Sequence, residues 1–255
     1  MEQKYIFLLG GNDLEMSEIR NILSKNNILY FDRSLSWSNA YLKEYTQELE
    51  RYGKMEGVSL YGVELNERDC DSIPSNYIRI DHHNDFSSYP ASILQVAAVL
   101  SIPVSRYQQL IAANDSGYIP GMIEIGATPE EINAIRLLDR EKQGVTLKDE
   151  EMAITSIENR TIDQGIIVVK SETNRFSPIC DRLFPYEKLL IYTNDELMYY
   201  GKEKERLSAH FESEINKGKM FHGGGADGYI GTAKGVYSVE EIFSLKKEII
   251  QEINN

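Results

Sequence analysis

The spacing of apolar residues changes along the chain and predicts two regions of different architecture. Up to about residue 160, short apolar runs alternate with segments whose apolar residues recur every three or four positions, as on one face of a helix. Strands that alternate with helices form a parallel sheet covered on both faces. The predicted strands span 4–9, 28–31, 58–65 and 77–81, and the predicted helices span 16–26, 39–52, 91–100, 104–113, 129–141 and 149–158.

The pattern beyond about residue 161 indicates a more antiparallel arrangement. Strands are predicted over 165–170, 189–193 and 196–200, and helices over 202–217 and 239–253, with a glycine-dense loop at 223–231 that precedes a short strand. We therefore expect an α/β protein with a cleft between two lobes. A parallel-sheet N-terminal lobe would span 1–160, and a smaller mixed α/β C-terminal lobe would span 165–255.

Composition narrows the class of protein and of partner. The 255 residues are 42% hydrophobic and 26% charged, and the formal net charge is -13. An excess of acids argues against binding long duplex nucleic acid, which needs lysine and arginine to neutralise phosphates. No apolar run approaches the ~18 residues that span a bilayer, and the first residues lack the features of a signal peptide. Cys70 and Cys180 lack the spacing of a zinc site and are expected to be reduced thiols, so we expect a cytoplasmic protein without a membrane partner.

Acids and histidines stand in four loops of the first region, and they are the candidates for chemistry. They are Asp13 with Glu15, Glu64, the run Asp81-His82-His83, and Asp115. Taken singly, these acids could be a helix N-cap, a strand terminus or a helix C-terminal turn. Taken together, they supply the carboxylate and imidazole ligands that manganese accepts, at the carboxyl ends of strands where α/β sheets bind ligands. The four loops therefore favour a metal site.

The order of these motifs resembles that of the DHH phosphoesterase superfamily. An acid pair, a strand-end acid, an Asp-His-His run and a later aspartate follow one another as in that family. The triple glycine at 223–225 resembles the signature of the C-terminal domain attached to many of its members. The resemblance covers nearly the whole chain, and it implies a DHH-type metal-binding catalytic domain over 1–160 and a DHH-associated substrate-binding domain over 165–255.

The resemblance also implies a role for each matching residue. One or two Mn²⁺ ions, with Mg²⁺ or Co²⁺ as alternatives, would be held by Asp13, Glu15, Glu64, His82 and Asp115. His83 would meet the substrate or its leaving group, and Asp81 would orient the histidine pair. The bound metal would lower the pKa of water and neutralise phosphate charge.

Substrate contacts are expected from the second lobe. The glycine loop would let backbone N–H groups approach a phosphate or nucleotide, and the forked guanidinium groups of two arginines suit phosphate recognition. The alternative for the arginines is an ordinary surface position. The candidates are Gly223, Gly224, Gly225, Arg175, Arg182 and His222.

The sequence departs from the family pattern at three places, and the first leaves open whether one metal or two is bound. Leu9 stands where many members have a histidine, glutamates occupy Glu15 and Glu64 where aspartates are usual, and Ala226 stands where a substrate-binding histidine is common. His222, next to the glycine loop, would substitute in part for the missing histidine, and the alternative is a plain surface histidine.

The sequence thus favours a manganese-dependent phosphoesterase or phosphodiesterase that hydrolyses a small phosphorylated substrate, a nucleotide or a short oligonucleotide. One alternative is a non-catalytic nucleotide-binding or regulatory protein on the same fold, which Leu9 and Ala226 motivate. Another is a structural subunit whose acids are only caps and solvated loops. The oligomeric state, a homodimer included, is left open by the sequence.

Overall fold

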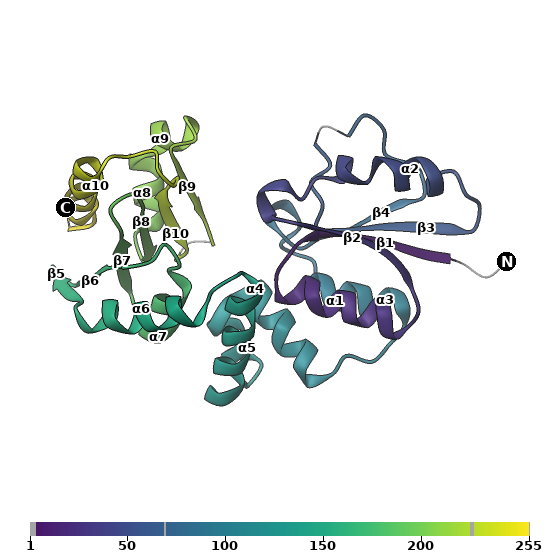
Figure 1. The fold of residues 1–255 in the computed structure, drawn as a ribbon, viewed down its shortest axis with the longest axis horizontal. Helices are drawn as coiled ribbons and strands as arrows, with labels where there is room; N and C mark the ends of the chain where they lie inside the picture. The colour runs from purple at the N-terminus through teal and green to yellow at the C-terminus, as the bar shows by residue number, and fades with distance from the viewer. Residues whose placement is uncertain (1–3, 69, 225–226, 255) are drawn as a thin grey trace. The chain divides into compact units, whose positions relative to one another are not determined.

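The first of two compact units is built on a four-stranded parallel sheet. The computed structural model describes residues 4–68, 70–224 and 227–254, and the chain divides into Met1–Gly144 and Val145–Asn255. In the first unit the strand order is β2-β1-β3-β4, and all neighbours run parallel (Figure 1). The strands are β1 (Lys4–Gly11), β2 (Leu29–Leu35), β3 (Val58–Val63) and β4 (Tyr77–Ile80).

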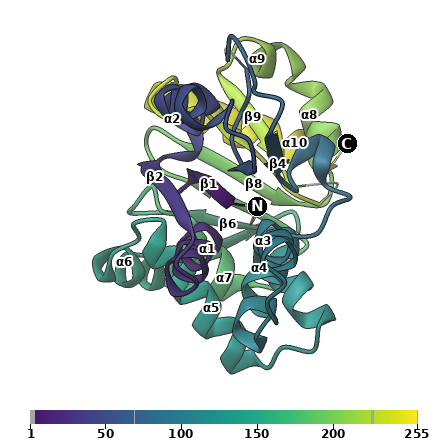
Figure 2. The ribbon, with the colours of Figure 1, turned by 90° about the vertical axis from the view of Figure 1, so that its right-hand side faces the viewer.

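Helices cover both faces of this sheet, as the alternation of strands and helices predicts. Figures 1 and 2 place α2 (Thr46–Tyr52) on one face and α1 (Leu14–Lys25) and α3 (Ser92–Leu100) on the other. Successive side chains of a strand point to opposite faces, so Ile6 and Leu8 of β1 pack into the cluster that contains Tyr45 and Leu49. Every residue of β3 is buried, which is typical of a strand covered on both sides.

The carboxyl end of β1 is pressed closely against its neighbours. A Cβ atom at Gly10 would lie 2.5 Å from the carbonyl oxygens of Val63 and Glu64, so only glycine allows this approach. The hydroxyl of Tyr45, which is fully buried, donates a hydrogen bond of 2.6 Å to the carbonyl oxygen of Leu9. These contacts fix the end of β1 relative to the end of β3, where candidate ligands lie.

The helix that carries Asp115 is longer than the sequence predicts. Helix α4 spans Arg106–Glu124, whereas the predicted helix ends at residue 113. Its path breaks at Tyr118, whose φ of 55° and ψ of -145° are not helical, and Pro120 stands in the first turn after the break, where its missing N–H is tolerated. Helix α5 (Pro129–Lys142) packs against α4 and begins with Pro129 and a capping box at Thr128.

The second unit contains a mixed six-stranded sheet in the order β5-β6-β7-β8-β10-β9. The pair β6–β7 is parallel, and the other pairs are antiparallel. One face of the sheet packs against α8 and α10, and the opposite face packs against α6 and α7. The strands are β5 (Thr161–Asp163), β6 (Ile166–Lys170), β7 (Lys188–Tyr192), β8 (Leu197–Gly201), β9 (Met220–Gly223) and β10 (Tyr229–Thr232). The helices are α6 (Leu147–Glu158), α7 (Ser177–Leu183), α8 (Lys204–His210), α9 (Glu212–Asn216) and α10 (Val239–Asn254).

Several boundaries differ from the predicted ones. Helix α6 belongs to the second unit, so the division falls at Gly144 and not near residue 160. The reason is that α6 packs against α7 and β6, which spacing within one segment cannot reveal. The predicted helix over 39–52 is α2 preceded by two 3-10 turns, Trp37–Asn39 and Leu42–Tyr45, and the one over 202–217 is divided at Phe211 into α8 and α9. None of the helices within the described ranges combines the length and apolar character that crossing a bilayer requires.

Candidate metal centre

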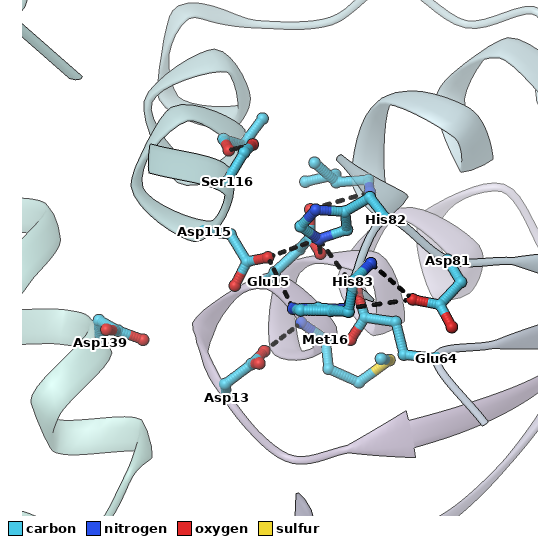
Figure 3. A network of polar contacts seen from close by, with 12 residues as sticks. Asp13, Glu15, Met16, Glu64, Asp81, His82, His83, Asp115, Ser116 and Asp139 are labelled. Carbon is cyan, nitrogen blue, oxygen red and sulfur yellow. Dashed lines mark hydrogen bonds and ion pairs between the residues drawn. The ribbon is translucent and has the colours of Figure 1, made fainter. Parts of the chain in front are cut away.

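The candidate ligands gather where three parallel strands end, beside α4 (Figure 3). Asp13 and Glu15 follow β1, Glu64 follows β3, and the Asp81-His82-His83 run follows β4. The chain turns sharply at Glu64, whose φ of 52° lies in the left-handed region that few residues other than glycine adopt. Its backbone N–H donates to the carbonyl oxygen of Ile80 at 2.8 Å, which ties this turn to β4. The strained turn therefore sets the direction of the Glu64 side chain.

The imidazole of His82 lies at the centre of three carboxylates. Its Nε2 atom is 2.6 Å from Oδ2 of Asp115, 3.4 Å from Oε1 of Glu64 and 3.5 Å from Oε2 of Glu15. His82, Glu64 and Glu15 are all buried, at 6%, 5% and 1% exposure. Three acids of one charge in such a space repel one another unless a cation stands among them.

Most of the facing atoms have no hydrogen-bond partner. These buried atoms are Oε2 of Glu15, both carboxylate oxygens of Glu64, Nε2 of His82, Nδ1 of His83 and Oδ2 of Asp115. A buried polar atom without a partner costs about 1–3 kcal/mol, so a group of them calls for an explanation. Ligand atoms of Glu64, His82, His83 and Asp115 lie within 4.8 Å of one another. Oxygen and imidazole donors this close together fit a divalent cation such as manganese.

His83 stands at the edge of this cluster and is held by Asp81. Oδ1 of Asp81 accepts a hydrogen bond of 2.9 Å from the backbone N–H of His83 and lies 3.4 Å from Nδ1 of its ring. The other ring nitrogen, Nε2, lies 3.9 Å from Oδ2 of Asp115. The His83 side chain is 35% exposed, so it can meet a bound molecule in a way that the buried His82 cannot.

Asp13 and Glu15 are both buried, but each already binds a helix N-terminus. Oδ1 of Asp13 accepts from the backbone N–H of Met16 at 2.8 Å and caps α1, the alternative that the sequence left open. Oε1 of Glu15 accepts from the N–H of Ile93 at 3.0 Å, in the first turn of α3. The second carboxylate oxygen of Glu15 lies 3.5 Å from Nε2 of His82, although neither Glu15 nor Asp13 belongs to the group whose ligand atoms all lie within 4.8 Å of one another.

Without a cation the site compensates its negative charge with protons. Burial, together with the charges of Glu64 and Asp115, raises the pKa of Asp13 from 3.8 to about 8. Burial also raises the pKa of Glu15 well above its ordinary value. Burial alone would lower the pKa of His82, but its contacts with Asp115, Glu15 and Glu64 outweigh that effect and raise the pKa to about 12. A divalent cation would take the place of these protons.

A buried polar network supports Asp115 from α5. Nη1 of Arg136 donates to Oδ2 of Asp139 at 2.7 Å and to Oδ1 of Asn114 at 2.9 Å. The same guanidinium lies over the ring of Tyr118, with its Cζ atom 4.6 Å from the ring centroid. The network therefore holds the residue before Asp115 and the break in α4 that follows it.

The predicted substrate contacts of the second unit come from β9 and the loop after it, and from α7 and the residue segment before it. Gly223 ends β9, Gly224 follows it with a φ of 75°, and Gly225 lies outside the described residues. His222 is exposed on β9, and Arg175 is exposed before α7. Nη2 of Arg182 pairs with Oε2 of Glu150 at 2.6 Å, which gives this arginine a structural contact between α7 and α6.

Sequence reasoning missed Trp37, which lies against the site. Its ring centroid is 5.1 Å from that of His83, and the two rings meet edge to face. Trp37 is the single tryptophan of the chain and directly follows the β2 region within a polar segment. A tryptophan in a polar segment after a predicted strand was the feature of the sequence that could have indicated this residue. Leu9, where many DHH proteins have a histidine, is fully buried in the core.

Comparisons with known proteins bear on the fold. No protein-family model matches the chain, and no curated protein matches it. Among solved structures, a DHH domain from a protein described as belonging to a family of ribosomal proteins matches with a TM-score of 0.50 and 12% identity, over 97% of this chain and 87% of that one. Exonuclease RecJ bound to manganese matches with a TM-score of 0.41 and 11% identity, over 97% and 89% of the two chains. CDC45 from Entamoeba histolytica matches with a TM-score of 0.38 and 8% identity, over 99% and 96%. The first of these likenesses, together with the parallel sheet and the separate mixed sheet, shows that this chain has a DHH-like fold.

Proposed function

We propose that this protein is a manganese-dependent phosphoesterase acting on a small phosphorylated substrate, a nucleotide or a short oligonucleotide. The observation that carries the proposal is the group of buried, unpartnered ligand atoms around His82. The DHH-like fold supports it, because in this fold the residues stand at the carboxyl ends of parallel strands.

One cation would be held by Glu15, Glu64, His82 and Asp115, because a carboxylate oxygen of each acid lies within 3.5 Å of Nε2 of His82. Three carboxylates with one imidazole suit Mn²⁺. Mg²⁺ would bind more weakly because it prefers oxygen ligands, and Co²⁺ would bind more strongly because it accepts nitrogen more readily. When bound, the cation would activate water and neutralise phosphate charge.

The remaining residues would position the reaction and move its proton. His83 would hydrogen-bond the leaving oxygen and donate a proton to it, because its ring is partly exposed beside the ligand cluster. Asp81 would hold the ring in orientation through Nδ1 and the backbone N–H. Arg136 would keep Asp115 in place through Asn114.

The test separates metal binding from turnover. Protein stripped of metal and reloaded with Mn²⁺ is examined by calorimetry and assayed with bis-p-nitrophenyl phosphate and a panel of dinucleotides. His82→Ala should abolish both manganese binding and turnover. His83→Gln should retain manganese binding and lose about 10²–10⁴-fold in kcat. His210→Ala is the matched control, since His210 is an exposed histidine of the second unit that pairs with Glu248.

The outcomes assign the function. Manganese-dependent turnover that His82→Ala removes would support the phosphoesterase. Tight manganese binding without turnover of any substrate would favour a non-catalytic nucleotide-binding protein on this fold. Absence of manganese binding by the wild-type protein would refute the metal centre and return the acids to capping roles.

A further inference from the structure

Trp37 is exposed beside the metal centre but is held in a fixed position. It begins the 3-10 turn that follows β2, and 48% of its surface is exposed. Part of the indole rests on Gly11, where an added Cβ atom would lie 2.9 Å from Cδ2 of the indole. Another part meets the ring of His83 at an interplanar angle of 71°. A large aromatic surface is thus left open to solvent next to the residue assigned to the leaving group.

The open indole borders a pocket that reaches the metal centre. The pocket has a volume of about 680 Å³, within the range of small-molecule sites. Trp37, Glu64, Asp81 and His83 are among its lining residues, so a molecule in it would lie against the ligand cluster. Phe86 lines the pocket as a second aromatic residue.

The wall of the pocket has more acids than cations. Its described lining residues include the carboxylates of Glu64, Glu67, Asp81 and Asp85 and the guanidinium groups of Arg68 and Arg79. Nε of Arg79 pairs with Oε1 of Glu67 at 2.8 Å, and its Cζ atom lies 4.6 Å over the ring of Phe86. Arg79 is therefore engaged in the wall itself. Glu64 and Asp81 likewise face the histidines of the metal centre, so Asp85 and Arg68 are the remaining charged groups of the described lining. A carboxylate acceptor and a guanidinium donor suit the amino and carbonyl groups of a neutral base.

We propose that this pocket binds the aromatic base of a nucleotide, stacked on Trp37, while the phosphate of the same nucleotide lies at the metal centre. The inference rests on the proposed function, since the metal centre anchors the phosphate. Every base has a flat face that can stack on an indole, and the amino groups of a base can donate to carboxylates such as Asp85. Trp37 then selects nucleotides over other small phosphate esters.

The test compares two phosphates that differ only in the base. Manganese-loaded protein is titrated with adenosine monophosphate and with ribose 5-phosphate, and calorimetry gives each Kd. Emission of Trp37 gives a second readout, because it is the single tryptophan and reports stacking directly. Adenosine monophosphate should quench this emission and bind about 5- to 150-fold more tightly than ribose 5-phosphate.

Variants assign that difference to the indole. Trp37→Leu should bring the two affinities together, and Trp37→Phe should keep part of the difference because a smaller ring still stacks. Tyr107→Leu removes an exposed aromatic side chain of α4 that does not line the pocket, and it should leave the difference unchanged.

Failure of the stacking and failure of the metal centre give different results. Equal affinities in the wild-type protein, or a difference that survives in Trp37→Leu, would overturn the stacking while manganese binding and turnover remain. If neither ligand binds although bis-p-nitrophenyl phosphate is hydrolysed, the base pocket is likewise refuted. Loss of manganese binding in the wild-type protein would instead overturn the metal centre.

Discussion

Replacing Arg136 of α5 tests whether its buried contacts hold α4, the helix that carries Asp115. The side chains of Arg136 and Asp139 are each 8% exposed, and they meet at 2.7 Å. Arg136 also donates to Asn114 and lies over the ring of Tyr118, on either side of Asp115 in the chain. Arg136→Met removes these contacts while keeping a flexible apolar side chain of similar length.

The expected cost comes mainly from the carboxylate that is left behind. Removing one partner of a buried ion pair costs about 3–5 kcal/mol, a large part of the ~5–15 kcal/mol that stabilises a domain. Burial raises the pKa of Asp139, and Arg136 opposes this rise. In Arg136→Met the pKa should therefore rise further, so the cost should be largest at neutral pH and shrink as acid protonates Asp139. The double variant Arg136→Met/Asp139→Leu should cost less than the single one.

The assay is urea unfolding followed by emission of Trp37. Since this tryptophan lies in the first unit, its signal reports on that unit even if the two units unfold separately. Arg51→Met is the control, because Arg51 is exposed and lies 5.1 Å over the ring of Tyr52. Manganese affinity should also fall about 10- to 100-fold in Arg136→Met. A cost below about 1 kcal/mol, or a double variant less stable than the single variant, would show that Arg136 does not stabilise the first unit through a buried ion pair.

Three further changes test the elements that position the site. Gly10→Ala should destabilise the first unit by about 1–3 kcal/mol and weaken manganese binding, because the added Cβ would lie 2.5 Å from backbone oxygens at the end of β3. Gly117→Ala is the control, since its added Cβ would meet open space, and it should change neither quantity in the same urea and calorimetric assays. Tyr45→Phe should cost about 0.5–1.5 kcal/mol at neutral pH. Burial raises the pKa of Tyr45 from 10.0 to about 12, so between these pH values the tyrosine ionises in the unfolded protein but not in the folded one. The wild type therefore loses stability in this range, and the difference in free energy of unfolding between wild type and Tyr45→Phe, measured by urea titration, should narrow as pH rises. Glu131→Gln should lower stability above pH 4.5 and approach the wild-type stability near pH 2. The reason is that Arg106 lowers the pKa of Glu131 from 4.5 to about 2, so the stabilisation is present above 4.5 and lost as pH falls to about 2. Salt should weaken this stabilisation in an acid titration followed by circular dichroism.

Helices and strands could be predicted from the sequence where the residues of the segment itself determine its secondary structure. The strands of the first unit and the helix that begins at Pro129 follow from apolar spacing and from capping residues at their ends. The division at Gly144 was predicted too late, because α6 joins the second unit through packing against α7 and β6. The short strand β5 was missed for a related reason, since its three residues are all exposed and show no apolar pattern.

In the candidate site, too, features set by one segment could be predicted, whereas contacts between segments distant in sequence could not. Acids and histidines at strand ends could be identified, because the carboxyl ends of parallel strands share one edge of the sheet. The helix cap made by one oxygen of Asp13 was an alternative that the sequence offered, whereas the bond from the first turn of α3 to one oxygen of Glu15 joins segments 78 residues apart and could not be predicted. These bonds use one carboxylate oxygen of each acid and leave the other oxygen of Asp13 and of Glu15 for a cation.

The contact between Trp37 and the site depends on the spatial order of the strands in the sheet, which the local sequence around Trp37 does not reveal. Strand β2 lies at one edge of the sheet beside β1, and β4 lies at the other edge beyond β3. The loop after β4 nevertheless brings His83 to within 5.1 Å of the indole, measured between ring centroids. Gly11 makes this possible, since a side chain there would occupy the place of the indole. The end of β1 thus carries small residues because ligands from β3 and β4 and an aromatic ring from the β2 side meet next to it. Gly11→Ala should therefore displace the indole of Trp37 and alter its fluorescence emission.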